Sequence, residues 1–187
     1  MNVSETHTLF LPFTHTISHL SRPLEIAKQM LDFGGRISFA GESSKTRFIE
    51  QEGFGVYPLF EPDPDLLFGN IRSKKIKFVS DSTLKKMIQA DLSLFDEIKP
   101  DLVVSDGRFS AMLSTQIAGI RHVSIVNGSS TAYRAVPYVP FIKQKAFDEF
   151  PPKGLVPRLL NPVNLKIEML MFDNIMGIFK SLSKEYG

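Results

Sequence analysis

Short apolar runs alternate along this chain with longer segments in which apolar positions recur at helical spacing. Each run is too short for a typical helix and is bounded by polar or turn residues, which is typical of a buried parallel strand. The predicted strands are residues 8–13, 36–40, 56–60, 101–105 and 122–126.

The segments that follow these runs carry helix start and stop signals. Gly34 ends the first, Ser43 or Ser44 can cap the second, Pro100 ends the third, and Gly119 is expected to cap the end of the fourth. The predicted helices are residues 22–33, 44–51, 81–99, 110–118 and 163–184. In the last of these, one apolar stripe is formed by Leu165, Met169, Phe172, Met176 and Phe179.

Alternation of strands and helices predicts an α/β fold with a Rossmann-like, doubly wound parallel sheet between two helical layers. We expect the strand order 3-2-1-4-5 and a single domain over residues 1–187. Residues 61–80 interrupt the alternation with Pro62, Pro64 and Gly69, which predicts a long variable surface loop.

Composition narrows the classes of partner. The chain has 187 residues, 43% of them hydrophobic, with a net charge of +2, which gives no reason to expect a nucleic-acid partner. Cysteine is absent, which excludes disulfides and thiolate metal sites and fits a cytoplasmic protein. No window approaches the roughly 18 apolar residues of a membrane span. The basic cluster at residues 72–77 is expected to be solvated, although contact with an anionic acceptor or a membrane surface stays open.

The loop after the first strand, residues 14–21, is where a doubly wound fold places its ligand. It contains no glycine, which disfavours a dinucleotide site, and the chain has neither a phosphate-binding P-loop nor a GxSxG nucleophile motif. The loop does contain His15 and His19. His19 can act as a general base because an ordinary imidazole is largely neutral at pH 7, or it can simply bond to the loop or cap the helix.

Several stretches together resemble GT-B glycosyltransferases of the UDP-glycosyltransferase and macrolide-glycosyltransferase type, over most of residues 8–135. These stretches are Ser18–Ala27, Asp32–Phe39, Glu52–Leu59, Pro100–Arg108 and Ala118–Val123. The sequence departs from the family pattern where Ser18 replaces the usual glycine and where Arg22 precedes a proline, Pro23, that is one position late.

The resemblance implies that this chain is the first, acceptor-binding half of a GT-B fold. It implies that His19 is the base and that Asp106 orients and charges it, whereas residue type alone would favour Asp106 as a helix cap. Because strands one and four are neighbours in the expected order, the two side chains should lie within about 2.6 to 3.2 Å. Arg108, Asn127 and Ser129, at the ends of strands four and five, are candidates for acceptor contact.

The family's donor-binding domain has no counterpart in these residues. The expected function is therefore acceptor binding in an enzyme that transfers a sugar from a nucleotide-sugar, in particular a UDP-sugar, to a hydroxyl of a small-molecule or lipid acceptor. We expect no cofactor or metal in this domain and no transfer activity from the chain alone. The alternative is a noncatalytic Rossmann-like binding module that pairs with a separate catalytic partner.

Overall fold

The computed structural model describes residues 6–73 and 79–127, and further along the chain 155, 159–160, 162–167, 170 and 177–186. Contacts divide the chain into two compact units, Met1–Ile125 with Leu182–Gly187 and Val126–Ser181. The sheet and the candidate site lie in the first unit.

The first unit is built on five parallel strands in the order β3-β2-β1-β4-β5. The strands are β1 (His7–Pro12), β2 (Arg36–Ala40), β3 (Gly55–Tyr57), β4 (Leu102–Asp106) and β5 (Arg121–Ile125). The expected fold class and strand order are confirmed, and the bounds of β2 are those predicted.

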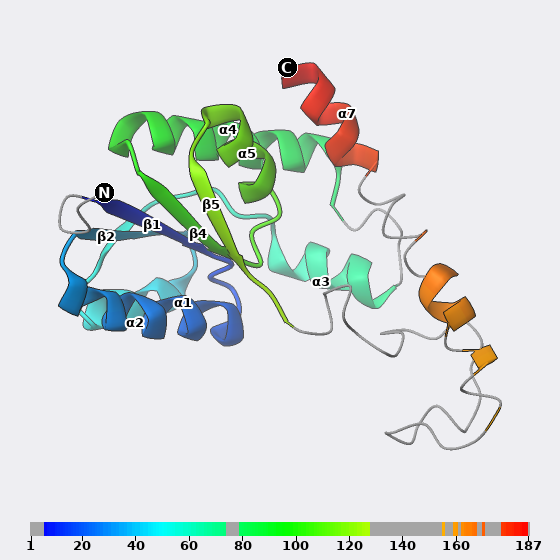
Figure 1. Ribbon diagram of the computed structural model, residues 1–187, viewed down its shortest axis with the longest axis horizontal. Coiled ribbons are helices and arrows are strands. Elements are labelled where there is room, and N and C mark those ends of the chain that lie inside the picture. Colours follow the sequence, from blue (N-terminus) through cyan, green and yellow to red (C-terminus); the bar gives the residue numbers. More distant parts are fainter. Residues whose placement is uncertain are drawn as a thin grey trace. The chain divides into compact units, whose positions relative to one another are not determined.

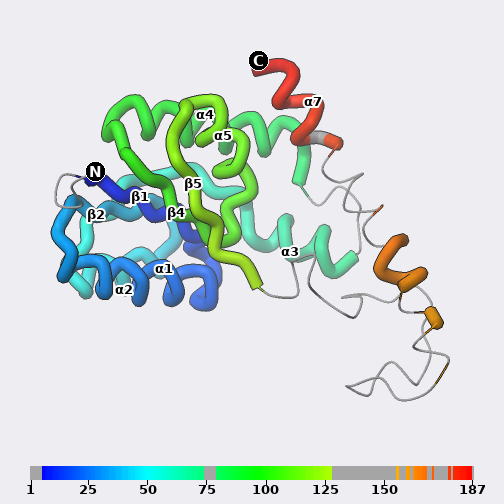
Figure 2. The backbone as a smooth tube through the Cα atoms, viewed as in Figure 1, coloured from blue at the N-terminus to red at the C-terminus, as the bar shows by residue number. Residues whose placement is uncertain are grey.

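Helices cover both faces of this sheet (Figure 1). The helices described in the chain are α1 (Ile17–Met30), α2 (Arg47–Gln51), α3 (Pro64–Arg72), α4 (Asp81–Ile98), α5 (Ala111–Ala118) and α7 (Gly177–Tyr186), with single 3-10 turns at Leu31–Phe33 and Ser44–Thr46. The helices α1 and α2 lie on one face, and α4 and α5 lie on the other. The backbone trace in Figure 2 follows the chain from β1 through α1 back to β2, and from α4 through β4 to α5.

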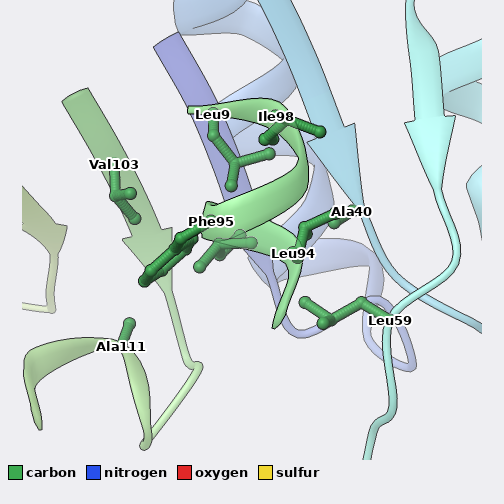
Figure 3. Close-up of a cluster of buried hydrophobic side chains, with 9 residues drawn as sticks. Leu9, Ala40, Leu59, Leu94, Phe95, Ile98, Val103 and Ala111 are labelled. Carbon is green, nitrogen blue, oxygen red and sulfur yellow. The ribbon is translucent and has the colours of Figure 1, made fainter. Parts of the chain in front are cut away.

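Alternation along the strands produces a separate apolar core on each face, because successive side chains point to opposite sides of a sheet. One core, shown in Figure 3, joins strand residues to α4 and α5 and contains Leu9, Leu11, Ala40, Leu59, Leu94, Phe95, Ile98, Val103 and Ala111. The other joins the same strands to α1 and α2 and contains Phe10, Leu20, Leu24, Ala27, Phe39, Ile49, Phe54 and Val104. Adjacent residues such as Val103 and Val104 therefore serve different cores.

The first helix begins five residues earlier than predicted, at Ile17. The prediction took Arg22-Pro23 as the helix start, since proline favours the first turn. In the structure Pro23 lies inside α1, and the preceding turn is helical because Leu20 packs in the same core as Leu24. His19 is consequently in the first turn of a helix and not in a loop.

The segment 61–80 also differs from the prediction, because it contains the helix α3. The Asp63 side chain accepts hydrogen bonds from the amides of Asp65 and Leu66 at 2.9 and 3.4 Å, and Pro64 occupies the first helical position. Leu67 is buried. An Asp-Pro pair that reads as a loop is thus a helix start, with the aspartate as N-cap.

The carboxy-terminal helix predicted for 163–184 is described only in part. Residues 162–167 are helical, and α7 covers the end of the range. Met169, Phe172 and Met176 of the predicted stripe lie outside the described residues. Within the first unit, Leu182 is buried and Glu185 pairs with Lys85 of α4 at 2.7 Å.

Candidate active site

The candidate site forms where β1 and β4 end side by side. Pro12 and Asp106 are paired in the strand register, and the amide of Phe13 donates to the Asp106 carbonyl at 2.8 Å. The chain then turns into α1, whose first turn carries His19 back over the end of β4. Residues 87 positions apart are thereby brought together at the carboxyl edge of the sheet.

His19 and Asp106 make a direct side-chain contact. The His19 Nδ1 atom lies 2.6 Å from Asp106 Oδ1, so the proximity expected from the sequence is confirmed. The Asp106 side chain is 1% exposed and the His19 side chain 30%. A carboxylate can only accept, so Nδ1 carries the proton and the Nε2 lone pair of a neutral imidazole remains for a proton from elsewhere.

Two neighbours fix the imidazole ring. Gly107 has φ +78°, and a Cβ added there would lie 3.1 Å from His19 Cγ and Nδ1. The ring of Phe13 meets the His19 ring edge to face, with centroids 6.4 Å apart. The close approach of the Gly107 backbone leaves His19 little freedom to leave Asp106.

Arg22 is a third member of this cluster that the sequence reasoning missed as a site residue. One guanidinium nitrogen lies 2.8 Å from Asp106 Oδ1 and 3.1 Å from His19 Nδ1. From the sequence, Arg22 was identified only as a departure from the family pattern. Its spacing of three from His19 was the available signal, because residues three apart share a helix face.

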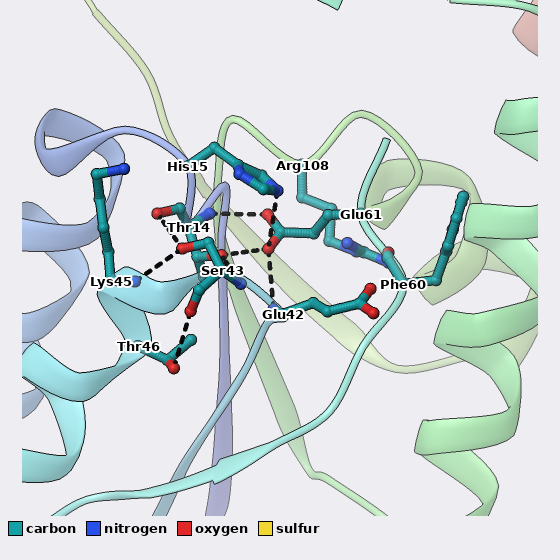
Figure 4. A network of polar contacts seen from close by, with 9 residues as sticks. All are labelled: Thr14, His15, Glu42, Ser43, Lys45, Thr46, Phe60, Glu61 and Arg108. Carbon is teal, nitrogen blue, oxygen red and sulfur yellow. Dashed lines mark hydrogen bonds and ion pairs between the residues drawn. The ribbon is translucent and has the colours of Figure 1, made fainter. Parts of the chain in front are cut away.

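A second polar network lies beside the first, around the buried carboxylate of Glu61 (Figure 4). Glu61 accepts hydrogen bonds from the Thr14 amide at 2.7 Å, from the Thr14 hydroxyl and from the Glu42 amide at 3.0 Å. Ser43 donates its hydroxyl to the Thr14 carbonyl at 2.8 Å. His15 Nε2 is 4.0 Å from the Glu61 carboxylate. Glu61 thus ties the loops after β1 and β2 together.

The three predicted acceptor contacts have different environments. Arg108 is buried, pairs with Asp91 at 2.7 Å and donates to the Phe60 carbonyl at 3.1 Å, so its contacts are structural. Asn127 is exposed two residues beyond β5, and Ser129 lies outside the described residues. The contacts of Arg108 are thus with Asp91 and Phe60 and not with the His19–Asp106 pair.

In the described ranges, no three His, Asp or Glu side chains gather in a way that could hold a metal ion. Among the helices that the structure describes, none has the length and apolar content to cross a membrane.

The fold of the first unit has a counterpart among solved structures. The solved structure of spinosyn forosaminyltransferase SpnP has the same fold, with a TM-score of 0.50 and 20% identity over 65% of this chain and 31% of that chain. The first unit is therefore the Rossmann-like fold found in GT-B glycosyltransferases. No protein-family model matches the chain.

Curated relatives in mycobacteria point to the same class. A PGL/p-HBAD biosynthesis rhamnosyltransferase of Mycobacterium bovis (strain BCG / Pasteur 1173P2) is 30% identical over 125 residues, which are 67% of this chain and 27% of the relative. A PGL/p-HBAD biosynthesis glycosyltransferase of Mycobacterium tuberculosis (strain ATCC 25177 / H37Ra) is 28% identical over 157 residues, 83% of this chain and 36% of the relative.

A relative named an inactive PGL/p-HBAD biosynthesis glycosyltransferase, from the same M. bovis strain, is also 28% identical over 157 residues, 42% of its length. The chain spans less than half the length of each of these relatives. In sequence and in fold, it resembles one segment of a GT-B glycosyltransferase.

Proposed function

We propose that this chain is the acceptor-binding half of a glycosyltransferase in which His19 is the general base. The contact between His19 Nδ1 and Asp106 Oδ1, at the shared edge of two neighbouring parallel strands, is the observation that carries the proposal. A doubly wound sheet binds its ligands at this edge.

In the proposed reaction, the Nε2 lone pair of His19 takes the proton of an acceptor hydroxyl. The acceptor oxygen forms a bond to the anomeric carbon of the sugar, and the bond from that carbon to the nucleotide diphosphate breaks with its electron pair on the diphosphate. Asp106 holds the imidazole in the Nδ1–H tautomer and stabilises the imidazolium that forms. General-base catalysis of this kind contributes about 10²–10⁴ in rate.

The proposed co-substrates are based on the class of fold and on the names of the relatives. We propose a nucleotide-sugar donor, in particular a UDP-sugar, held mainly by a donor-binding domain that these residues do not supply. The proposed acceptor is a hydroxyl of a small molecule or a lipid, since the mycobacterial relatives are named for PGL/p-HBAD biosynthesis and SpnP for a spinosyn. A cytoplasmic location is a proposal that rests on the lack of cysteine.

A binding measurement tests whether the donor site lies outside these residues. We expect UDP-glucose to bind this chain weakly or not at all, because the donor contacts are assigned to another domain. Isothermal titration calorimetry would measure the binding. A dissociation constant in the low micromolar range would contradict the assignment, since the donor site would then lie in these residues.

The alternative function is a noncatalytic binding module that works with a separate catalytic partner. This alternative is retained because the chain is as similar to the relative that is named inactive as to the M. tuberculosis glycosyltransferase, 28% identical over 157 residues in each case. A transfer assay of the chain fused to the donor-binding half of the M. bovis rhamnosyltransferase, with a simple phenol and a long-chain alcohol as acceptors, tells the two apart. Turnover that depends on His19 supports the enzyme, and turnover that is indifferent to His19 supports the module.

A further inference from the structure

We propose that Arg22 is a positioning residue that keeps His19 neutral by compensating the charge of Asp106. The claim concerns the charge state of His19 in this chain, and its importance for catalysis rests on the proposed function. Nothing in the resemblance to glycosyltransferases assigns Arg22, which stands at a position where this sequence departs from the family pattern.

The buried carboxylate is the starting point. Asp106 is 0% exposed, and an ionised carboxylate so placed needs a compensating positive charge. Its Oδ1 atom receives both Arg22 at 2.8 Å and His19 at 2.6 Å, whereas Oδ2 is buried without a hydrogen-bond partner among the described residues. Two donors therefore share one oxygen, and a positive charge on one of them is enough to balance the charge of the Asp106 carboxylate.

Arg22 is the group best placed to supply that charge. A guanidinium stays protonated in proteins, and this side chain is 33% exposed, so it keeps contact with water. Its Nε donates to the Ser18 carbonyl one turn earlier, at 3.1 Å, which directs the guanidinium toward Asp106. Both Arg22 and His19 belong to α1, so the guanidinium and the imidazole are carried by the same helix.

A charged guanidinium opposes a charged imidazole. The Arg22 nitrogen lies 3.1 Å from His19 Nδ1, and like charges at such a distance disfavour each other. The charged groups with a contact to His19 in the described structure are Arg22 of α1 and Asp106 of β4, while Phe13 and Gly107 are uncharged. His15 also packs on Phe13, but its nearest carboxylate is that of Glu61.

The arrangement therefore separates two tasks. Arg22 balances the buried charge, and Asp106 is left to fix the tautomer of a neutral imidazole. Without Arg22, protonation of His19 would be the way to balance Asp106, and the Nε2 lone pair that a base needs would be occupied. Arg22 would then widen the pH range in which His19 can accept a proton.

The experiment is an NMR titration of the His19 imidazole in this chain, without donor or acceptor. His19 is assigned by its loss in His19→Gln. In Arg22→Gln and Arg22→Ala, we expect the titration midpoint of His19 to move up by about one pH unit, as for removal of a neighbouring like charge. In Arg22→Lys, which keeps the charge, we expect a much smaller change.

The matched control is Lys28→Gln, which removes a positive charge from the same helix. By helical rise, Lys28 lies about 13 Å from His19, which is beyond the Debye length at physiological salt. We expect no shift of the His19 midpoint there. An unchanged or lowered midpoint in both folded Arg22 variants, or an equal shift in Lys28→Gln, overturns the proposal. Loss of the folded state in both variants also overturns it, because Arg22 would then serve the fold. The assay involves no turnover, so its failure leaves the role of His19 as base to its own test.

Discussion

At the scale of single residues, the site depends on a backbone position that only glycine fills well. Gly107 follows Asp106 with a positive φ, and its missing Cβ leaves the space in which the His19 ring lies. The pairing of the histidine with the aspartate was predicted from the resemblance to GT-B glycosyltransferases, because residue type alone favoured a helix cap for Asp106 and left the role of His19 open. The role of Gly107 could not be predicted, since it depends on how closely α1 approaches the end of β4.

The role of Gly107 can be tested by comparing two glycine substitutions. Gly107→Ala should push the His19 ring away from Asp106, whereas Gly119→Ala, also at a positive φ but with open space around its Cβ, should only strain the backbone. Both should lower the free energy of unfolding by about 1–2 kcal/mol through the left-handed backbone. NMR should show the Nδ1–H hydrogen bond of His19 lost in Gly107→Ala alone. Retention of that bond in Gly107→Ala would contradict the structure.

A second prediction concerns His7, at the start of β1. Burial lowers the pKa of His7, against the opposing effect of the Ile98 carbonyl, which Nδ1 approaches at 3.2 Å. Since the unfolded histidine takes up its proton near pH 6.5 and the folded one only at lower pH, the free energy of unfolding should be highest above about pH 6.5 and fall as the pH decreases.

Urea denaturation at about pH 7.5 and about pH 5 would measure this effect. His7→Gln should show a smaller loss of stability between the two pH values than the parent chain. Some loss should remain, because burial also lowers the pKa of His122. An equal loss in the variant would show that His7 does not contribute.

At the scale of elements, the stretch Phe60–Glu61 connects three loops at the carboxyl edge. Glu61 binds the loops after β1 and β2 through Thr14 and Glu42, and the Phe60 carbonyl accepts from Arg108 after β4. The loop that carries His15 and leads into α1 is therefore held by contacts from outside α1. Hydrogen bonds that cross between loops of distant sequence give no periodic signal, so this network could not be predicted from the chain alone.

Gly41 tests this network. A Cβ at Gly41 would overlap the Thr14 methyl, whereas nothing lies within 4 Å of a Cβ at Gly55. We expect Gly41→Ala to lower the free energy of unfolding by about 1–3 kcal/mol through overpacking and to disturb the Thr14–Glu61 contact. Gly55→Ala should have a much smaller effect. Chemical denaturation measures both, and equal effects would argue against the tight contact at Thr14.

The bounds of the helices and strands show where sequence patterns are sufficient to predict the fold. The strand Arg36–Ala40 was predicted to the residue, because an apolar run between turn residues allows one arrangement in a covered parallel sheet. The start of α1 was predicted late, since Pro23 was given more weight than the burial of Leu20. The helix α3 was missed because Pro64 was interpreted as a breaker, although Asp63 caps it.

At the scale of the whole molecule, the described sheet belongs to one Rossmann-like unit with a histidine and a buried aspartate at the carboxyl edge of the sheet. The relatives it matches are two to four times as long as the matched segment, and they are named glycosyltransferases. We propose that His19 takes a proton from an acceptor hydroxyl and that a separate donor-binding half brings the sugar.

Turnover of His19→Ala in the fusion with a donor-binding half tests this claim most directly, with Lys28→Ala as the control for a substitution on α1. We predict that His19→Ala reduces kcat by about 10²-fold or more, as expected for loss of a general base, while the affinity for the nucleotide-sugar is nearly unchanged and Lys28→Ala keeps its turnover. A His19→Ala enzyme with near-normal kcat would contradict the account.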